Sequence, residues 1–182
     1  MNAIDPRDAR RILIVDDNLS IHEDFRKILA KSDRPQEALS DAAAALFGEP
    51  APEMHPDLER YDVQFASQGQ DAYEMVQQSS QDETPFALAF VDVRMPPGWD
   101  GIQTASRMLD ADPFLQIVIC TAYSDYTFEE MVSQLDWTDR VLILKKPYDC
   151  CEVRLLALSL TEKWQLARSA FSLLHSLAGE SI

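Results

Sequence analysis

Five short apolar runs alternate with segments of helical periodicity, and this alternation constrains the fold more than any other feature of the chain. Strands separated by helices predict a parallel sheet with helices on both faces. Most of the runs are continuously apolar, which predicts strands buried on both sides. The strand-like runs cover residues 11–15, 61–66, 86–91, 115–120 and 141–144, and the helical spacing covers residues 21–29, 69–78, 101–110 and 127–135.

Polar side chains suited to phosphate chemistry stand where these strands end. Asp16 and Asp17 end the first strand, Asp92 ends the third, Thr121 follows the fourth, and Lys146 lies just beyond the fifth. In a doubly wound sheet such strand ends converge at the topological switch point. Clustered carboxylates repel one another, which raises a pKa or demands a cation. Mg²⁺ fits because it prefers oxygen ligands, few carboxylates and phosphate oxygens.

Each of these residues also has an ordinary interpretation. Asp16 or Asp17 would serve as a helix cap, Thr121 as a turn former and Lys146 as a solvated surface residue. Their occurrence at successive strand ends, in this order, favours phosphate chemistry instead. An Asp carboxylate can attack phosphorus, so the pattern predicts phosphoryl transfer at one of the acids.

Residues 32–60 interrupt the alternation, because such folds need only a few residues between a helix and the next strand. Within them, residues 35–47 have the composition of a helix that begins at Pro35 and stops at Gly48. Two interpretations stay open, a tolerated surface insertion and a device for docking a partner.

The segment from Cys151 onward carries apolar residues at alternating spacings of four and three. This seam is typical of a helix that packs on another helix. We expect its first half to cover the sheet and its second half to form a contact between two copies of the chain. Packing on the same subunit or on a downstream domain are the alternatives. The seam comprises Val153, Ala157, Leu160, Trp164, Ala167, Phe171, Leu174 and Ala178.

The chain of 182 residues has a formal net charge of −15, which argues against direct nucleic-acid binding and against attraction to anionic lipid. The N-terminus lacks the apolar core of a signal peptide, and no run reaches membrane-spanning length. The three cysteines, among them the neighbours Cys150 and Cys151, show neither metal-ligand spacing nor a disulfide framework. Together these features predict a cytoplasmic protein.

Four stretches, RILIVDD, FVDVRMPPGWDG, IVICTAYSD and VLILKKP, give the chain a specific resemblance. It resembles the receiver domain of two-component response regulators, which has the chemotaxis-type, flavodoxin-like α/β fold. The resemblance implies a five-stranded parallel sheet of order 2-1-3-4-5. It also implies a receiver domain over residues 9–160, with residues 32–60 inserted after the first helix, and an extended C-terminal signalling helix over residues 161–182.

The resemblance implies a role for each acid. Asp92 would accept the phosphoryl group. Asp17 and Asp92 would bind Mg²⁺ together with the backbone carbonyl of Arg94, and Asp16 would assist through water.

It implies further roles at the other strand ends. Thr121 would bond to the phosphoryl group in the active state, and Lys146 would pair with it. The Lys146–Pro147 peptide bond is expected to be cis, a form that is essentially confined to X–Pro bonds.

Two features depart from the family pattern. The loop between Asp92 and the Asp100–Gly101 pair is one residue longer than usual, and Ile143 occupies a switch position that is often aromatic. Tyr123 or Tyr126 would be substitutes for the missing aromatic residue.

The resemblance predicts a phosphorylation-dependent switch rather than an enzyme, with only self-catalysed phosphoryl transfer and dephosphorylation. Its partner would be a histidine kinase or phosphotransfer protein, and the C-terminal helix would form a homodimer. Receivers with such helices resemble the N-terminal parts of regulators with cyclic-dinucleotide outputs. A dimerisation or scaffold domain that is never phosphorylated, and an aspartyl-phosphate phosphohydrolase, are the alternatives.

Overall fold

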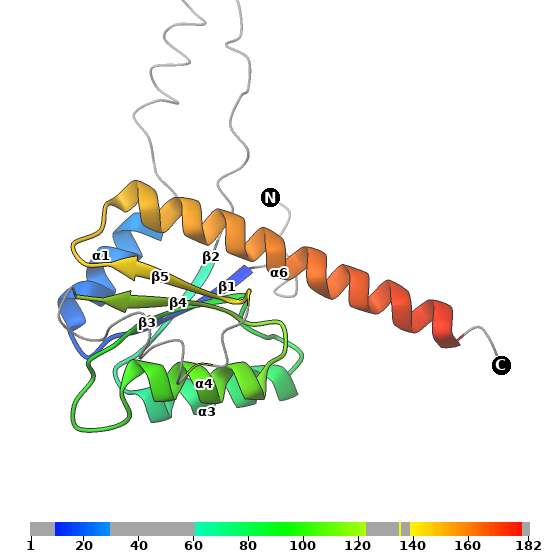
Figure 1. Cartoon of the computed structure of the whole chain (residues 1–182), viewed down its shortest axis with the longest axis horizontal. Coiled ribbons are helices and arrows are strands. Elements are labelled where there is room, and N and C mark those ends of the chain that lie inside the picture. Colours follow the sequence, from blue (N-terminus) through cyan, green and yellow to red (C-terminus); the bar gives the residue numbers. More distant parts are fainter. Residues whose placement is uncertain (1–9, 30–60, 123–134, 136–138, 180–182) are drawn as a thin grey trace, which may run out of the picture.

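The structure is a computed structural model of the chain, and it describes residues 10–29, 61–122, 135 and 139–179 (Figure 1). The helix predicted at residues 35–47, most of the helix predicted at residues 127–135, and Tyr123 and Tyr126 lie outside these described residues. Leu135 is described and is buried.

The described strands form one parallel sheet in the order β2-β1-β3-β4-β5, as the sequence predicts. β1 lies between β2 and β3 and pairs with both of them. Most strand bounds differ from the predicted ones by one or two residues. The strands are β1 (Arg10–Val15), β2 (Tyr61–Ala66), β3 (Leu88–Asp92), β4 (Gln116–Thr121) and β5 (Val141–Lys145).

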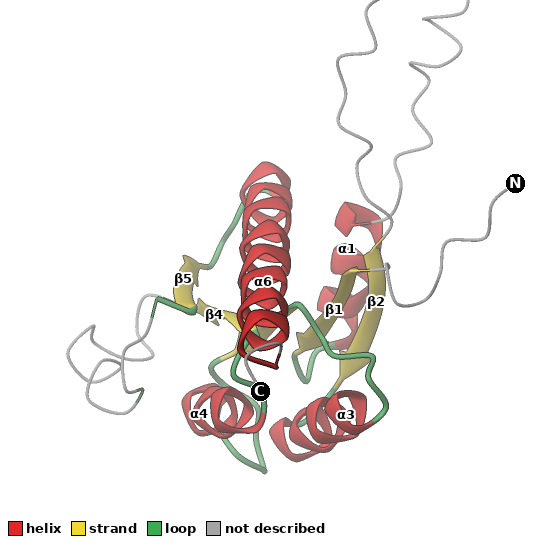
Figure 2. Cartoon of the chain, turned by 90° about the vertical axis from the view of Figure 1, so that its right-hand side faces the viewer, coloured by secondary structure: helices red, strands yellow, loops and turns green. Residues whose placement is uncertain are grey.

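The described helices cover the two faces of this sheet. α1 (Leu19–Leu29) and α6 (Cys150–Gly179) lie on one face, and α3 (Gly69–Gln81) and α4 (Gly101–Ala111) lie on the other (Figure 2). The result is the three-layer, doubly wound arrangement expected of the flavodoxin-like class.

The central strands contribute to two apolar cores, because successive side chains along a strand point to opposite faces. In β3, Phe90 packs on the side of α1 and α6, whereas Val91 packs on the side of α3 and α4. Both residues are almost completely buried. This double burial is the physical reason for the continuously apolar sequence of the run.

α6 continues far beyond the sheet that its first part covers (Figure 1). Its 30 residues correspond to a helix about 45 Å long. Val153, Ala157 and Leu160 are buried against the sheet. None of the described helices combines the length and the apolar character that a membrane crossing requires.

Arg10, the first residue of β1, attaches α6 to the sheet near the point where the helix leaves it. Its guanidinium donates hydrogen bonds to Thr161 Oγ1 at 3.1 Å, Glu162 Oε1 at 2.7 Å and Gln165 Oε1 at 2.6 Å. Arg10 is only 9% exposed, so these contacts replace most of its hydration.

Two residues of the second half of the predicted seam, Trp164 and Phe171, have partners within the same chain, although Phe171 stays 48% exposed. The ring of Phe171 lies edge-on to Phe114, with centroids 5.3 Å apart. Trp164 is half-buried, and the Arg168 guanidinium lies over its ring at 4.8 Å. The leucines that stay most exposed beyond Leu160 are Leu166, Leu173, Leu174 and Leu177.

Candidate phosphoryl-transfer site

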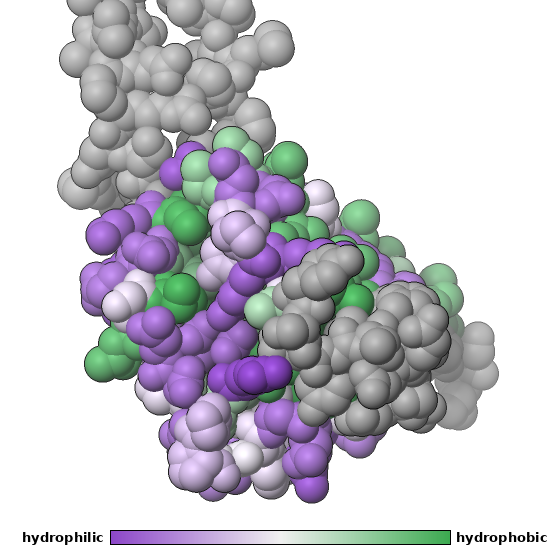
Figure 3. Space-filling model, turned by 60° about the vertical axis from the view of Figure 1, so that its left-hand side comes forward, coloured by the Kyte–Doolittle hydropathy of each residue, from purple (hydrophilic) through white to green (hydrophobic). Residues whose placement is uncertain are grey.

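Three carboxylates meet at the carboxyl edge of the sheet, where parallel strands place their end residues. Asp16 follows β1 and is buried, Asp17 is exposed, and Asp92 is the last residue of β3. One oxygen of each lies within 4.8 Å of the others. Hydrophilic residues predominate on the side of the molecule shown in Figure 3, interspersed with smaller apolar patches.

Lys146 joins two of these acids. Its ammonium donates to Asp92 Oδ1 at 2.8 Å and to Asp16 Oδ2 at 3.1 Å. The Lys146 backbone N–H donates to the carbonyl of Thr121 at 2.8 Å, which fixes the start of the loop after β5. The Lys146–Pro147 peptide bond is cis, as expected.

Burial and charge oppose each other at Asp92 and at Lys146. Burial raises the pKa of Asp92, while the hydrogen bond and charge of Lys146 act to lower it. For Lys146, burial acts to lower the pKa, but the bond with Asp92 and the charges of Asp16 and Asp92 outweigh it, so the pKa is raised. Lys146 therefore keeps its positive charge at neutral pH.

The donor set fits Mg²⁺. Three carboxylates and one ammonium leave a formal charge of −2, which a divalent cation would neutralise. Ligand oxygens about 2.1 Å from Mg²⁺ in octahedral geometry lie roughly 3–4 Å apart. The observed separations within 4.8 Å need only small side-chain movements to reach that spacing. Asp16 is partly oriented already, because its Oδ1 accepts from the Asn18 N–H at 2.9 Å.

Thr121 and Arg94 lie near this group in the fold, and their predicted roles stay predictions. Thr121 is buried at the end of β4, and its hydroxyl donates to the Ala122 carbonyl at 3.0 Å. Arg94 lies in the loop between β3 and α4 with its side chain exposed.

Gly101 supports the site in a way that the sequence analysis did not identify. Its N–H donates to the Val93 carbonyl at 2.8 Å. A Cβ atom added to it would lie 2.1 Å from the Asp92 carbonyl oxygen. The only signal in the sequence is the Asp100–Gly101 pair, in which Asp100 caps α4 by accepting from the Gln103 N–H at 2.8 Å.

Trp99, in the longer loop, has partners on both neighbouring helices. Its ring lies edge-on to Tyr73 of α3 at 5.9 Å, and the Arg107 guanidinium of α4 lies over it at 4.1 Å. Ile143 of β5 is opposite Ile119 of β4 and packs partly buried against the core on the α3 and α4 side. The longer loop is therefore packed onto the domain.

Solved structures share this fold at low sequence identity. An adenylate cyclase structure from Rhodopirellula baltica aligns with a TM-score of 0.63 and 19% identity, over 92% of this chain and 98% of that one. A response regulator receiver protein from Sinorhizobium medicae aligns with a TM-score of 0.56 and 22% identity, over 86% of this chain and 98% of that one. At these identities the likeness establishes the fold.

Sequence comparisons identify the family. An uncharacterized response regulatory protein of Vibrio cholerae is 32% identical over 101 residues, which are 55% of this chain and 36% of the relative. The chain thus spans about a third of the length of the curated relative that it matches. The family model described as "Response regulator receiver domain" matches residues 54–154, more than half of the chain. The chain therefore belongs to the response regulator receiver domain family, whose members serve phosphorylation-dependent two-component signalling.

Proposed function

We propose that this chain is a switch that accepts a phosphoryl group on Asp92 from a histidine kinase or a phosphotransfer protein. The observation that carries the proposal is the Lys146 ammonium bonded to both Asp92 and Asp16, with Asp17 beside them at the same sheet edge. In the transfer, an Asp92 oxygen attacks phosphorus and forms a P–O bond as the P–N bond to the donor histidine breaks.

The chain's own residues position the reacting groups and neutralise the negative charge of the phosphoryl group. Burial leaves the pKa of Asp92 raised, but the hydrogen bond and charge of Lys146 limit this rise and so favour the ionised nucleophile. The same ammonium would pair with an oxygen of the incoming phosphoryl group. Asp17, Asp92 and the Arg94 carbonyl would hold Mg²⁺, with Asp16 assisting through water. Bound there, Mg²⁺ supplies positive charge to the phosphoryl oxygens.

We also propose a division of the chain into two parts, which the same arrangement supports. Residues 9–160 form the receiver, with residues 32–60 inserted, and residues 161–182 carry the signal outward. After transfer, the Thr121 hydroxyl would turn to the phosphoryl group, and this would shift the packing near β5. α6 begins at Cys150, four positions after Lys146, so a change at the site is passed directly to the helix.

We place the contact between two copies on the far half of α6. Leu166, Leu173 and Leu177 recur at spacings of seven and four, as a helix–helix seam requires, and each is at least 64% exposed. This seam replaces the one through Trp164 and Phe171, because those rings already contact their own chain.

Phosphoryl acceptance is tested by incubating the chain with acetyl phosphate and Mg²⁺ and measuring its intact mass. We expect a single phosphoryl adduct that is lost in Asp92→Asn and kept in Asp110→Asn, a change at an exposed position of α4. An adduct that persists in Asp92→Asn, or no adduct under any condition, would overturn the assignment.

The seam is tested by sedimentation. We expect Leu173→Glu to weaken self-association, while His175→Glu leaves it unchanged. Both residues are exposed on α6, but His175 lies on the side of the helix opposite to Leu166, Leu173 and Leu177. Equal effects of the two changes would refute the proposed seam. A native chain that is monomeric at high concentration would refute the proposed dimer.

A further inference from the structure

Two thiols stand side by side at the first turn of α6, outside the acidic site. Cys150 and Cys151 are the first two residues of the helix, and both are exposed. The remaining cysteine, Cys120, is buried in β4. The pair is therefore accessible from solvent, whereas Cys120 is not.

The two thiols are poorly suited to form a disulfide with each other. Neighbouring Cα atoms are about 3.8 Å apart across a trans peptide bond. An ordinary disulfide joins Cα atoms about 4.4–6.8 Å apart, so oxidation would distort the first turn of the helix. The hydrogen bond with Asp149 raises the pKa of the Cys151 thiol, so oxidation and cation binding alike require that the thiol first lose its proton.

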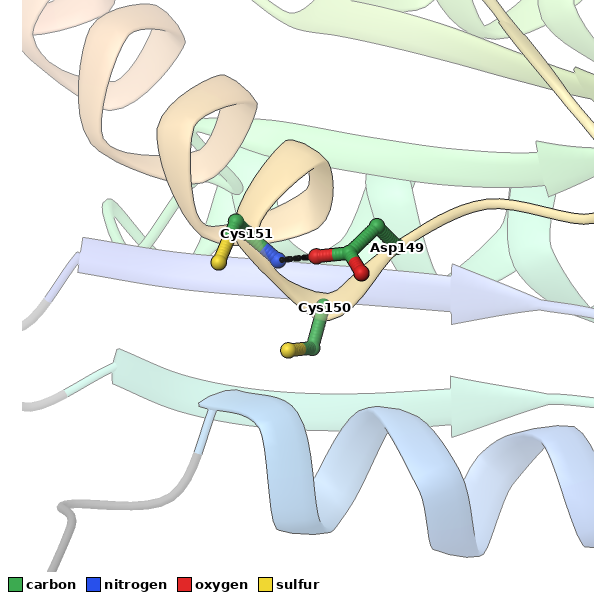
Figure 4. Close-up of side chains that lie close together, drawn as sticks. All are labelled: Asp149, Cys150 and Cys151. Atoms are coloured by element: carbon green, nitrogen blue, oxygen red, sulfur yellow. Dashed lines mark hydrogen bonds between the residues drawn. The ribbon is translucent and has the colours of Figure 1, made fainter.

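Asp149 adds an oxygen donor to the pair (Figure 4). Its Oδ1 accepts from the Cys151 N–H at 2.7 Å, and its own N–H donates to Glu152 Oε2 at 2.7 Å. This reciprocal capping box fixes the backbone of the first turn. The Asp149 carboxylate and the two sulfur atoms all lie within 4.8 Å of one another.

We propose that Asp149, Cys150 and Cys151 bind a thiophilic divalent cation of the zinc and cadmium class, with water completing the coordination. The spacing of the cysteines alone predicts no metal site; the capping carboxylate supplies the third ligand. Tetrahedral ligands about 2.3 Å from such a cation lie roughly 3.8 Å apart. The three exposed side chains reach that spacing by small rotations from separations within 4.8 Å.

This site is chemically distinct from the acidic site. Two thiolates favour a borderline or soft cation, whereas the carboxylates of Asp16, Asp17 and Asp92 favour Mg²⁺. A cation on Asp149, Cys150 and Cys151 would clamp the first turn of the helix that we propose carries the signal. Binding itself does not depend on phosphorylation of Asp92.

The test is a titration of the full chain with Cd²⁺, followed by the ultraviolet cadmium–thiolate charge-transfer band. We expect the band to saturate at one cation per chain and to disappear in Cys150→Ser and in Cys151→Ser. Asp149→Asn should weaken binding while leaving the cap intact, because the Asn side-chain oxygen still accepts from the Cys151 N–H.

Three variants separate this site from the rest of the molecule. Cys120→Ala, Asp17→Asn and Asp92→Asn should leave the band unchanged, and circular dichroism checks that each variant is folded. A full band in either serine variant, loss of the band in Asp17→Asn, or no band in the native chain would overturn the proposal. Because Asp92→Asn abolishes the phosphoryl adduct but not the cadmium band, the two proposals fail independently.

Discussion

Replacing Gly101 by alanine tests whether the start of α4 holds the phosphoryl-transfer site in place. The added Cβ would lie 2.1 Å from the Asp92 carbonyl oxygen and 2.8 Å from Val93 Cα. Ordinary contact begins at 3.4 Å, so the backbone of β3 and the first turn of α4 must separate by about 1.3 Å. Neither neighbour is a flexible side chain, so the strain falls on the backbone.

The expected loss of stability follows from two opposing effects. Overpacking of this kind costs typically about 1–3 kcal/mol, and a clash with backbone belongs at the upper end of that range. In the middle of a helix alanine gains about 0.5–1 kcal/mol over glycine, and at Gly101, the first residue of α4, the gain is at most of this size. We therefore expect Gly101→Ala to lower the free energy of unfolding by about 2 kcal/mol. Because Asp92 itself is displaced by roughly 1 Å, phosphoryl acceptance should slow by about 100-fold.

Gly98→Ala in the same loop is the matched control. Its Cβ would meet only the amide ends of Gln70 and Gln68, at 2.5 and 2.8 Å. Those flexible ends can move aside, so the free energy of unfolding should change by less than about 0.5 kcal/mol. Urea unfolding followed by circular dichroism measures stability, and the rate of phosphoryl incorporation from acetyl phosphate measures the site. Equal behaviour of Gly101→Ala and Gly98→Ala would refute the reasoning.

Four further outcomes are expected. Burial raises the pKa of Asp92 in the folded chain, so its ionised form costs stability above that pKa. Asp92→Asn should raise the melting temperature at pH 7, and calorimetry should find the gain lost as the pH falls through the raised pKa of Asp92 to 3.8, the ordinary pKa of the group. Lys146→Met should raise the pKa of Asp92 further, because it removes the ammonium that acts to lower this pKa, and an NMR titration of the Asp92 carboxyl carbon would report the change. An unchanged pKa would contradict the bond between Lys146 and Asp92. Removing Mg²⁺ with EDTA should prevent the Asp92 adduct, and an undiminished yield would exclude the proposed cation. Arg10→Met should lower the free energy of unfolding by about 2 kcal/mol and speed amide exchange beyond Thr161, whereas unchanged exchange would mean that packing alone holds α6.

The sheet was predictable from the sequence because its central strands are buried on both faces. A strand such as β3 then reads as an uninterrupted apolar run, and the run ends where the chain reaches the polar edge. The bounds were less predictable. Phe86 and Ala87 are buried, yet β3 begins only at Leu88. The Ala87 N–H already donates to the Arg11 carbonyl at 2.9 Å, and the Ala87 carbonyl accepts from the Gln116 N–H at 3.1 Å, so burial and cross-strand hydrogen bonds both begin before the strand itself.

The meeting of Asp16, Asp92 and Lys146 was predictable from one rule, that the carboxyl ends of parallel strands share an edge. The backbone packing that supports these residues was not predictable from the sequence. The role of Gly101 depends on an approach of two backbone segments that composition and spacing do not record. The contact between Phe114 and Phe171 depends on the direction of α6, which the buried Arg10 helps to set.

The position of β1 has a consequence for where this domain can be cut. The family model recognises residues 54–154, yet β1 ends at Val15 and forms the middle of the sheet, between β2 and β3. A fragment trimmed to the recognised span would separate β2 from every neighbour it has in the described sheet, and would discard Asp16 and Asp17. The span that the family model matches is therefore smaller than the unit that must fold together, and expression work should keep the segment from Arg10 onward.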